Sequence, residues 1–201
     1  MLAVGALWDA VAEAGEFTGS GYRLAMSPLR ATDRAVVVMG VSGTGKSTVG
    51  AVLADALGVP FVEGDDLHPE VNVAKMAAGI QLTDEDRAPW LDLIAAELHR
   101  PVVVACSALR RVYRDRLRRD APDLALVYLH GNPELLAERM GGRPGHFMPT
   151  ALLDSQLATL EPPTLDENAI AMDVVLPPAE IVVRVVQQLR DGTVDTALDT
   201  A

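Results

Sequence analysis

Residues 40–48 of the chain read GVSGTGKST, which matches the phosphate-binding pattern G-x-x-x-x-G-K-[ST]. The glycines allow the backbone to turn tightly and to point N–H groups at a phosphate, and the helix that follows adds the positive end of its dipole. Lys46 would contact the β- and γ-phosphates, and the hydroxyl of Ser47 would bind Mg²⁺. The apolar run AVVVM precedes the loop and the helical run VGAVLADAL follows it, as the motif requires. We therefore predict a nucleotide site, rather than a plain glycine-rich turn, at Gly40, Ser42, Gly43, Thr44, Gly45, Lys46, Ser47 and Thr48.

Two adjacent carboxylates, Asp65 and Asp66, follow the second predicted strand in the segment EGDDLHP. Because this strand end should lie near the terminal phosphate, one of the two could orient an acceptor hydroxyl, accept its proton, or hold a water of the Mg²⁺ shell. The alternative is an aspartate that serves only a turn or a helix N-terminus. His68 in the same segment could bind a polyol by hydrogen bonds, or could be an ordinary loop histidine.

Several cations are candidates for binding an anionic acceptor. Arg87 begins a predicted helix in TDEDRAPWL, where its guanidinium could hold a carboxylate or could pair with Asp84 three residues earlier. Arg143 lies in the glycine-rich segment MGGRPGHFMP, which could form a lid that closes over the phosphate, or could be an exposed loop arginine. Only two of the 17 basic residues are lysines, so Lys75 is a candidate beside Lys46, although an exposed helix position would also explain it.

A run of arginines follows the third predicted strand. We expect most of them to form a solvated helix face, and we single out Arg110 as a substrate candidate because it lies nearest the strand end. The run comprises Arg110, Arg111, Arg114, Arg116, Arg118 and Arg119.

Composition limits the possible functions. The chain has 201 residues, enough for one substantial core, and its net charge of −11 argues against a nucleic-acid partner. The single cysteine, Cys106, fits a reducing, cytoplasmic location and is expected to be a buried residue at a strand end. No apolar run is long enough to cross a membrane, so no membrane partner is expected.

Short β-branched runs alternate with helical patterns from Arg34 onward, which predicts a three-layer α/β/α sandwich around a parallel five-stranded sheet with ligands at the carboxyl ends of the strands. The predicted strands are Ala35–Met39, Phe61–Glu63, Val102–Ala105, Ala125–Leu129 and Ala169–Asp173. The predicted helices are Gly45–Leu57, Asn72–Ala78, Asp84–Leu98, Leu109–Arg119, Pro133–Met140, Pro149–Leu160 and Pro178–Arg190. This gives an N-terminal extension and linker (1–34), one domain (35–190) with a lid near 141–149, and a C-terminal tail (191–201).

Six segments together resemble the small P-loop gluconate kinases: GVSGTGKST, GDDLHP, NVAKMAAGIQLTDEDRAPWL, CSALRRVYRDRLR, GHF and SQLATLEPP. The combination of GD-x-LHP, DR-x-PWL and CSAL is much more specific than the phosphate loop alone. The resemblance, which covers about Val36 to Val186, implies a nucleoside-monophosphate-kinase-like fold with a mobile lid, commonly a homodimer. It implies Mg²⁺-dependent transfer of phosphate from ATP to the 6-hydroxyl of D-gluconate.

The same resemblance assigns roles to individual residues. It implies that Lys46 and Ser47 hold the phosphate and the metal, that Asp65 lies next to the acceptor hydroxyl, and that Arg139 and Arg143 lie beside the adenine and in the lid. With the residue pattern, we expect Lys46, Asp65 and Arg143 to be catalytic and Ser47 and Asp65 to hold the metal ion. The substrate contacts that we expect from the resemblance and the residue pattern together are Asp65, His68, Lys75, Arg87, Arg110, His146 and Gln156.

Two alternatives and one departure accompany this assignment. The chain could be another small-acid kinase, such as a shikimate kinase, or a catalytically silent nucleotide-binding regulator. A GTPase would need an N-K-x-D motif, which the sequence lacks. Near the C-terminus the family's usual polar D-x-D-Q-P is replaced by DVVLP, with Val175 and Leu176, so the chain departs from the family at the base and not at the phosphates.

Overall fold

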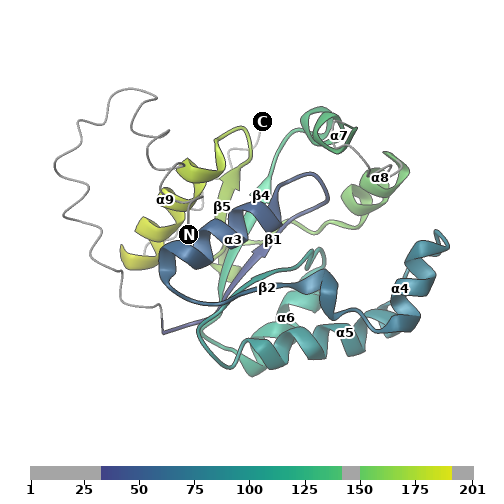
Figure 1. The fold of residues 1–201 in the computed structure, drawn as a ribbon, viewed down its shortest axis with the longest axis horizontal. Coiled ribbons are helices and arrows are strands. Elements are labelled where there is room, and N and C mark those ends of the chain that lie inside the picture. The colour runs from purple at the N-terminus through teal and green to yellow at the C-terminus, as the bar shows by residue number, and fades with distance from the viewer. Residues whose placement is uncertain (1–32, 142–149, 192–201) are drawn as a thin grey trace.

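A computed structural model describes residues 33–141 and 150–191 of the chain, and its centre is a five-stranded parallel sheet (Figure 1). The sheet has the order β2-β3-β1-β4-β5. Val36 lies opposite Val103 on one side and Ala125 on the other, so β1 is the central strand. The strands are β1 Val36–Met39, β2 Phe61–Glu63, β3 Val103–Ala105, β4 Ala125–His130 and β5 Ile170–Asp173, which confirms all five predictions to within one residue at each end.

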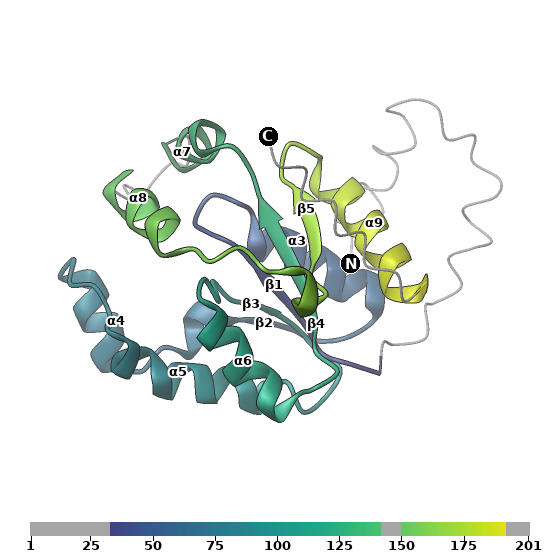
Figure 2. The same ribbon diagram turned by 180° about the vertical axis from the view of Figure 1, so that it is seen from behind.

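Helices cover both faces of the sheet, as Figures 1 and 2 show. In β1 the side chains of Val36 and Val38 pack with α3 (Lys46–Leu57) and α9 (Pro178–Asp191). Those of Val37 and Met39 pack on the other face with α5 (Asp84–Glu97) and α6 (Arg111–Asp120). Alternate residues of one strand therefore enter two separate cores, which explains why the strand is apolar throughout and confirms the three-layer architecture.

The remaining helices lie beyond the carboxyl ends of the strands. They are α4 Glu70–Ala77, α7 Pro133–Gly141 and α8 Thr150–Thr159, together with the short 3₁₀ helix η1 Gly64–Leu67. A second 3₁₀ helix, η2 Leu165–Glu167, lies instead just before the start of β5. In both views α4 lies on one side of the loop after β1, and α7 and α8 lie on the other (Figures 1 and 2). No helix in residues 33–141 and 150–191 is long and apolar enough to cross a membrane.

Two helix starts differ from the prediction by more than one residue. Helix α4 begins two residues early, directly after Pro69, whose φ of −54° suits a helix start. Helix α6 begins two residues late, because Ala108 has a positive φ of 41° and Arg110 is extended at φ −102° and ψ 146°. The predicted extension (1–34) and lid (141–149) lie outside the described residues except for Asp33, Arg34 and Gly141, and of the predicted tail only Asp191, the last residue of α9, is described.

The prediction that the arginine run forms a solvated face is wrong for Arg114. This side chain is 1% exposed and makes a bidentate ion pair with Glu167 of η2, with Nε–Oε2 and Nη2–Oε1 distances of 2.6 and 2.7 Å. Its third nitrogen donates to the carbonyl oxygens of Ala108 and Leu109. The helical periodicity of α6 could not reveal this, because the partner lies 53 residues away.

Glu167 is charged in the folded protein. Burial alone would raise its pKa, but hydrogen bonds from Arg114, Arg118 and the Thr164 N–H hold the pKa at about 2, below the ordinary 4.5. A carboxyl group with a lowered pKa stabilises the fold above its unfolded-state pKa. This contribution is therefore present above about pH 4.5 and is lost as the pH falls towards 2.

We predict that Arg114→Met lowers the free energy of unfolding by about 3–5 kcal/mol, because it leaves Glu167 buried with only part of its compensation. The matched control is Arg116→Met. Arg116 makes a similar bidentate pair with Asp92, but on the surface, so its loss should cost no more than about 1 kcal/mol. Urea unfolding at pH 7 measures both variants, and equal losses would show that burial of the Arg114 pair has no special effect.

Candidate active site

The phosphate loop packs directly on β4. Gly40 has a φ of 147°, and a Cβ atom at this position would lie 2.4 Å from the carbonyl oxygen of Leu129. A Cβ at Gly43, where φ is 84°, would lie 2.8 Å from the carbonyl oxygen of Leu136 in α7. These contacts leave no room for a side chain, so glycine at both positions is required by the fold as well as by phosphate binding.

The loop is also held by its own side chains. The buried hydroxyl of Thr44 donates to the carbonyl oxygen of Val41 over 2.8 Å, and Lys46 Nζ donates to the same oxygen over 3.1 Å. Gly45 is the left-handed N-cap of α3, and Ser47 and Thr48 are exposed in the first turn of that helix. The predicted nucleotide residues thus surround the open N-terminus of α3, where backbone N–H groups have no helical partner.

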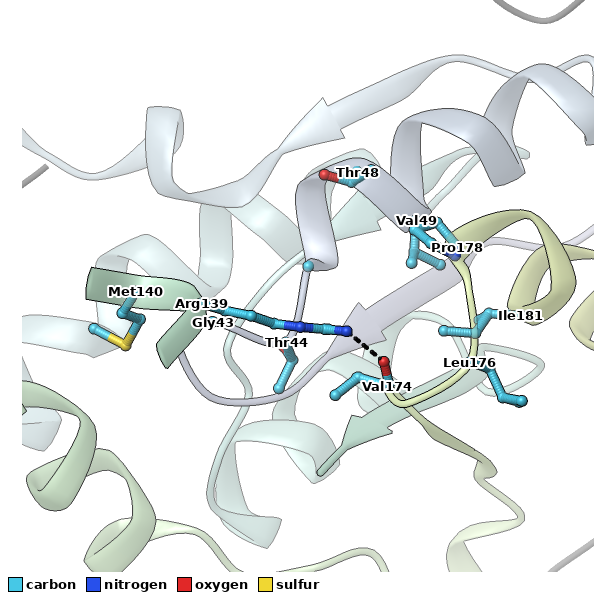
Figure 3. A pocket seen from close by; sticks show the side chains of 11 residues that line it. Gly43, Thr44, Thr48, Val49, Arg139, Met140, Val174, Leu176, Pro178 and Ile181 are labelled. Carbon is cyan, nitrogen blue, oxygen red and sulfur yellow. Dashed lines mark hydrogen bonds between the residues drawn. The ribbon is translucent and has the colours of Figure 1, made fainter. Parts of the chain in front are cut away.

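A pocket of about 250 Å³ adjoins the loop (Figure 3). Arg139 extends from α7 across this pocket and donates to the carbonyl oxygen of Val174 over 2.8 Å. Val174 and Leu176 belong to the altered DVVLP segment, so that segment lines the pocket. Its size and apolar walls suit a flat base, and Arg139 lies in it.

Asp65 lies at the end of β2, on η1. The Trp90 indole donates to the carbonyl oxygen of Gly64 over 2.7 Å and so fixes η1 to α5. The Asp65 side chain is exposed, and its carboxylate accepts no hydrogen bond within the described part of the chain. The carboxylate is therefore available to an incoming ligand.

Cys106 lies just after β3, between the ends of β1 and β2, and senses charges from both neighbouring strand ends. The pKa of its thiol is raised to about 12, mainly by burial, with a smaller upward effect from the charge of Asp65 and a downward effect from that of Lys46. Both charges therefore act at the end of β3, which indicates that Lys46 and Asp65 share this edge of the sheet. Cys106 itself is 1% exposed, which confirms the prediction of a buried residue at a strand end.

His68 is held by two residues that the sequence did not single out. Its ring stacks on Trp90, with centroids 4.2 Å apart and planes inclined by 11°. Asn72, which is 1% exposed, places Nδ2 3.5 Å from His68 Nδ1 and donates to the carbonyl oxygen of Asp86 over 2.7 Å. Burial lowers the pKa of His68, opposed by Asp65 and assisted by Arg87, so the ring is neutral at pH 7 and suits hydrogen bonding to hydroxyl groups.

The candidate cations differ in how far internal carboxylates already engage them. Lys75 Nζ lies 2.6 Å from Asp86 Oδ1, and Arg110 pairs with Asp84 and, over 3.5 Å, with Glu161. Arg87 makes no ion pair with the described residues, not even with Asp84 as the alternative interpretation required. It donates to the carbonyl oxygen of Leu82.

The aromatic ring of Tyr113 lies close to two of these cations. The guanidinium carbons of Arg87 and Arg110 are 5.8 and 5.6 Å from its centroid. The Tyr113 hydroxyl donates to Asp84 over 2.5 Å, so the tyrosine and Arg110 share this carboxylate. Of the three cations, Arg87 is therefore the one whose charge is best placed for an external carboxylate.

Gln156 on α8 reaches the phosphate loop and accepts a hydrogen bond from the backbone N–H of Ser42 over 2.6 Å. Arg143 and His146 lie outside the described residues. The structure thus brings the loop, Arg139 and Gln156 together on one side, and Asp65, His68 and Arg87 on the other. Asn72 and Trp90 were missed, because nothing in their local sequence shows that their partner is His68.

Known proteins are similar to this chain over most of its length. A family model described as shikimate kinase matches residues 42–190. A gluconokinase of Gluconobacter oxydans (strain 621H) is 52% identical over 68% of this chain and 80% of its own length. The solved structure of a gluconokinase from Sinorhizobium meliloti 1021 is 54% identical, with a TM-score of 0.75 over 81% of this chain and 94% of that one.

A shikimate kinase from Acinetobacter baumannii, solved in complex with shikimate, is more distant. It is 19% identical, with a TM-score of 0.53 over 82% of this chain and 97% of that one. This likeness shows the shared fold alone.

We predict that Gly40→Ala weakens binding of Mg-ATP at least tenfold, because the new methyl group would meet the backbone of Leu129 and displace the loop. The control is Gly58→Ala, at the C-terminal end of α3. Gly58 also has a positive φ of 68°, but open space surrounds it, so only backbone strain is added and the loop is untouched. Isothermal titration calorimetry measures both affinities, and unchanged binding by Gly40→Ala would contradict the prediction.

Proposed function

The chain belongs to the gluconokinase family, and we propose that it transfers the γ-phosphate of ATP to the 6-hydroxyl of D-gluconate, giving 6-phospho-D-gluconate and ADP. The observation that carries this proposal is the 52% identity to a gluconokinase over 80% of that protein's length. The shikimate-kinase alternative is supported less, because three solved shikimate kinases are only 17–19% identical to this chain.

The nucleotide would bind on the α3 side of the site. The N–H groups at the start of α3 would receive the β-phosphate, Lys46 would contact the β- and γ-phosphates, and the base would enter the pocket beside Arg139. An apolar Leu176 in this pocket offers the base packing rather than hydrogen bonds. Discrimination between adenine and other bases would then depend on the backbone and on Arg139.

Two residues fit a Mg²⁺ ion that arrives with the nucleotide. The Ser47 hydroxyl and the Asp65 carboxylate are both exposed, and both present oxygen atoms. Mg²⁺ takes oxygen ligands, keeps several waters, and commonly needs only one or two protein groups in addition to phosphate oxygens. The ion would supply charge neutralisation at the phosphates.

The acceptor would lie between η1 and α5. Asp65 would accept a hydrogen bond from the 6-hydroxyl and so aim its oxygen at the γ-phosphate. Neutral His68 would bind a hydroxyl of the polyol chain, and Arg87 would bind the carboxylate of gluconate as a fork. Lys75 and Arg110, each paired with a carboxylate of the protein, would stabilise α4, α5 and α6 around the substrate.

Phosphate transfer itself needs little covalent work from the protein. Positioning and charge neutralisation supply most of the rate, with Lys46 and the lid arginine Arg143 offsetting the charge that develops. The roles of Arg143 and His146, the homodimer and the cytoplasmic location stay predictions from the resemblance and from composition.

The first test is release of ADP from Mg-ATP by the purified protein with D-gluconate, with shikimate, and without an acceptor. We expect release that depends on gluconate, with 6-phospho-D-gluconate as product. Stimulation by shikimate alone would favour the alternative kinase, and ATP binding without transfer to either acid would favour a silent regulator.

Asp65→Asn should lower turnover at least 100-fold while the protein still binds ATP, because the amide cannot take the hydroxyl proton.

The proposed contact between Arg87 and the gluconate carboxylate leads to a separate prediction. Arg87→Ala should raise KM for gluconate about 10- to 100-fold and leave KM for ATP unchanged, because a charge-assisted hydrogen-bonded contact contributes about 1.5–3 kcal/mol. Arg100→Ala is the control, since Arg100 follows the far end of α5 and pairs with Glu97 on the surface. Steady-state kinetics with each substrate varied in turn measure both variants. A normal KM for gluconate in Arg87→Ala would exclude the fork.

A further inference from the structure

Gln156 contacts the phosphate loop through its side-chain amide, and the partner atom determines which way the amide is turned. The backbone N–H of Ser42 can only donate, so the side-chain atom that it meets at 2.6 Å must be the amide oxygen Oε1. The amide nitrogen Nε2 then retains two N–H donors. No hydrogen bond from Nε2 is formed within the described residues, and the side chain is half-buried at the edge of the loop.

Gln156 and Lys46 contact the same peptide unit of the loop, the one that joins Val41 to Ser42. Lys46 Nζ lies 3.1 Å from the carbonyl oxygen of Val41, and the same peptide unit continues into the N–H of Ser42. In a phosphate loop the lysine ammonium reaches the β- and γ-phosphates, whereas the N-terminus of the helix holds the phosphates nearer the nucleoside. Gln156 therefore lies at the γ-phosphate end of the loop.

Helix α8 holds Gln156 at this place by contacts that do not involve the loop. Leu153 is 2% exposed in the core that α3 and α9 share. After the helix, the N–H of Glu161 donates to the carbonyl oxygen of Leu109 over 2.8 Å, and the chain continues into the buried pair of Glu167 with Arg114. A donor on a helix that is anchored at Leu153 and just beyond its end loses little freedom when a ligand binds.

We propose that Gln156 donates a hydrogen bond from Nε2 to the γ-phosphate of the bound nucleotide, with its amide plane fixed by the Ser42 N–H. This is a contact with the phosphate donor and differs from the contact with gluconate that the resemblance implies. The inference rests on the proposed function only in requiring a nucleoside triphosphate. Because it concerns the γ-phosphate, it can be tested without any acceptor.

The experiment compares the affinities of the full chain for ADP and for a non-hydrolysable β,γ-imido analogue of ATP, each with Mg²⁺, by isothermal titration calorimetry. In Gln156→Met, which keeps the length of the side chain but has no donor, we expect the analogue to bind about tenfold more weakly and ADP to bind as in the unmodified protein. In Gln156→Glu the oxygen can still accept from Ser42, but the donor is replaced by a negative charge. The loss of affinity for the analogue should therefore be larger than in Gln156→Met, while the affinity for ADP should again stay unchanged.

The matched control is Ser155→Ala, on the same turn of α8. It removes the hydrogen bond from Gln81 Nε2 to Ser155 Oγ, 3.0 Å long and exposed, and so weakens the attachment of the helix without changing Gln156. Neither affinity should change in this variant. Equal losses for ADP and the analogue in both Gln156 variants, or no loss in either, would overturn the proposal. Thermal unfolding of each variant shows whether it is folded, and no outcome depends on whether gluconate is the acceptor.

Discussion

The buried ion pair between Arg114 and Glu167 is the interaction on which the arrangement of the site depends. Arg114 lies in the first turn of α6, just after the turn that follows β3. Its guanidinium donates to the carbonyl oxygens of that turn and pairs with Glu167 in η2, the 3₁₀ helix before β5. Two buried charges are costly unless each is fully hydrogen-bonded, and here every nitrogen of the guanidinium has an acceptor. The pair therefore joins the turn after β3 to the segment that connects α8 with β5, and α8 carries Gln156 to the phosphate loop.

The two halves of the proposed site would recognise their ligands by different means. The nucleotide half consists mostly of backbone: glycines pressed against β4 and α7, the N-terminus of α3, and an apolar pocket. The acceptor half consists of side chains, among them Asp65, neutral His68 and Arg87, on η1 and α5. This division has a physical reason, because phosphates are matched well by converging N–H groups, whereas a polyol acid needs donors, acceptors and a charge at separate places.

Internal pairing distinguishes the cations of the acceptor half from one another. Lys75 and Arg110 each lie against a protein carboxylate, whereas Arg87 lies against a carbonyl group and the face of Tyr113. An anionic substrate must displace a paired carboxylate to reach the first two, but it can add to Arg87 directly. Specificity for an acid can therefore come from one arginine, while its charged neighbours hold the helices together.

The sequence by itself determined the five strands, the helices and the phosphate loop, because these follow from local periodicity and from a motif with fixed spacing. It could not show that Arg114 is buried, that Asn72 and Trp90 support His68, or that Gln156 meets Ser42. Each of these depends on a partner on another element, in the case of Gln156 114 residues away. Local pattern determines which face of an element is apolar, but only the packed sheet decides which polar side chains meet across it, because their hydrogen bonds require distances of about 3 Å that sequence spacing does not encode.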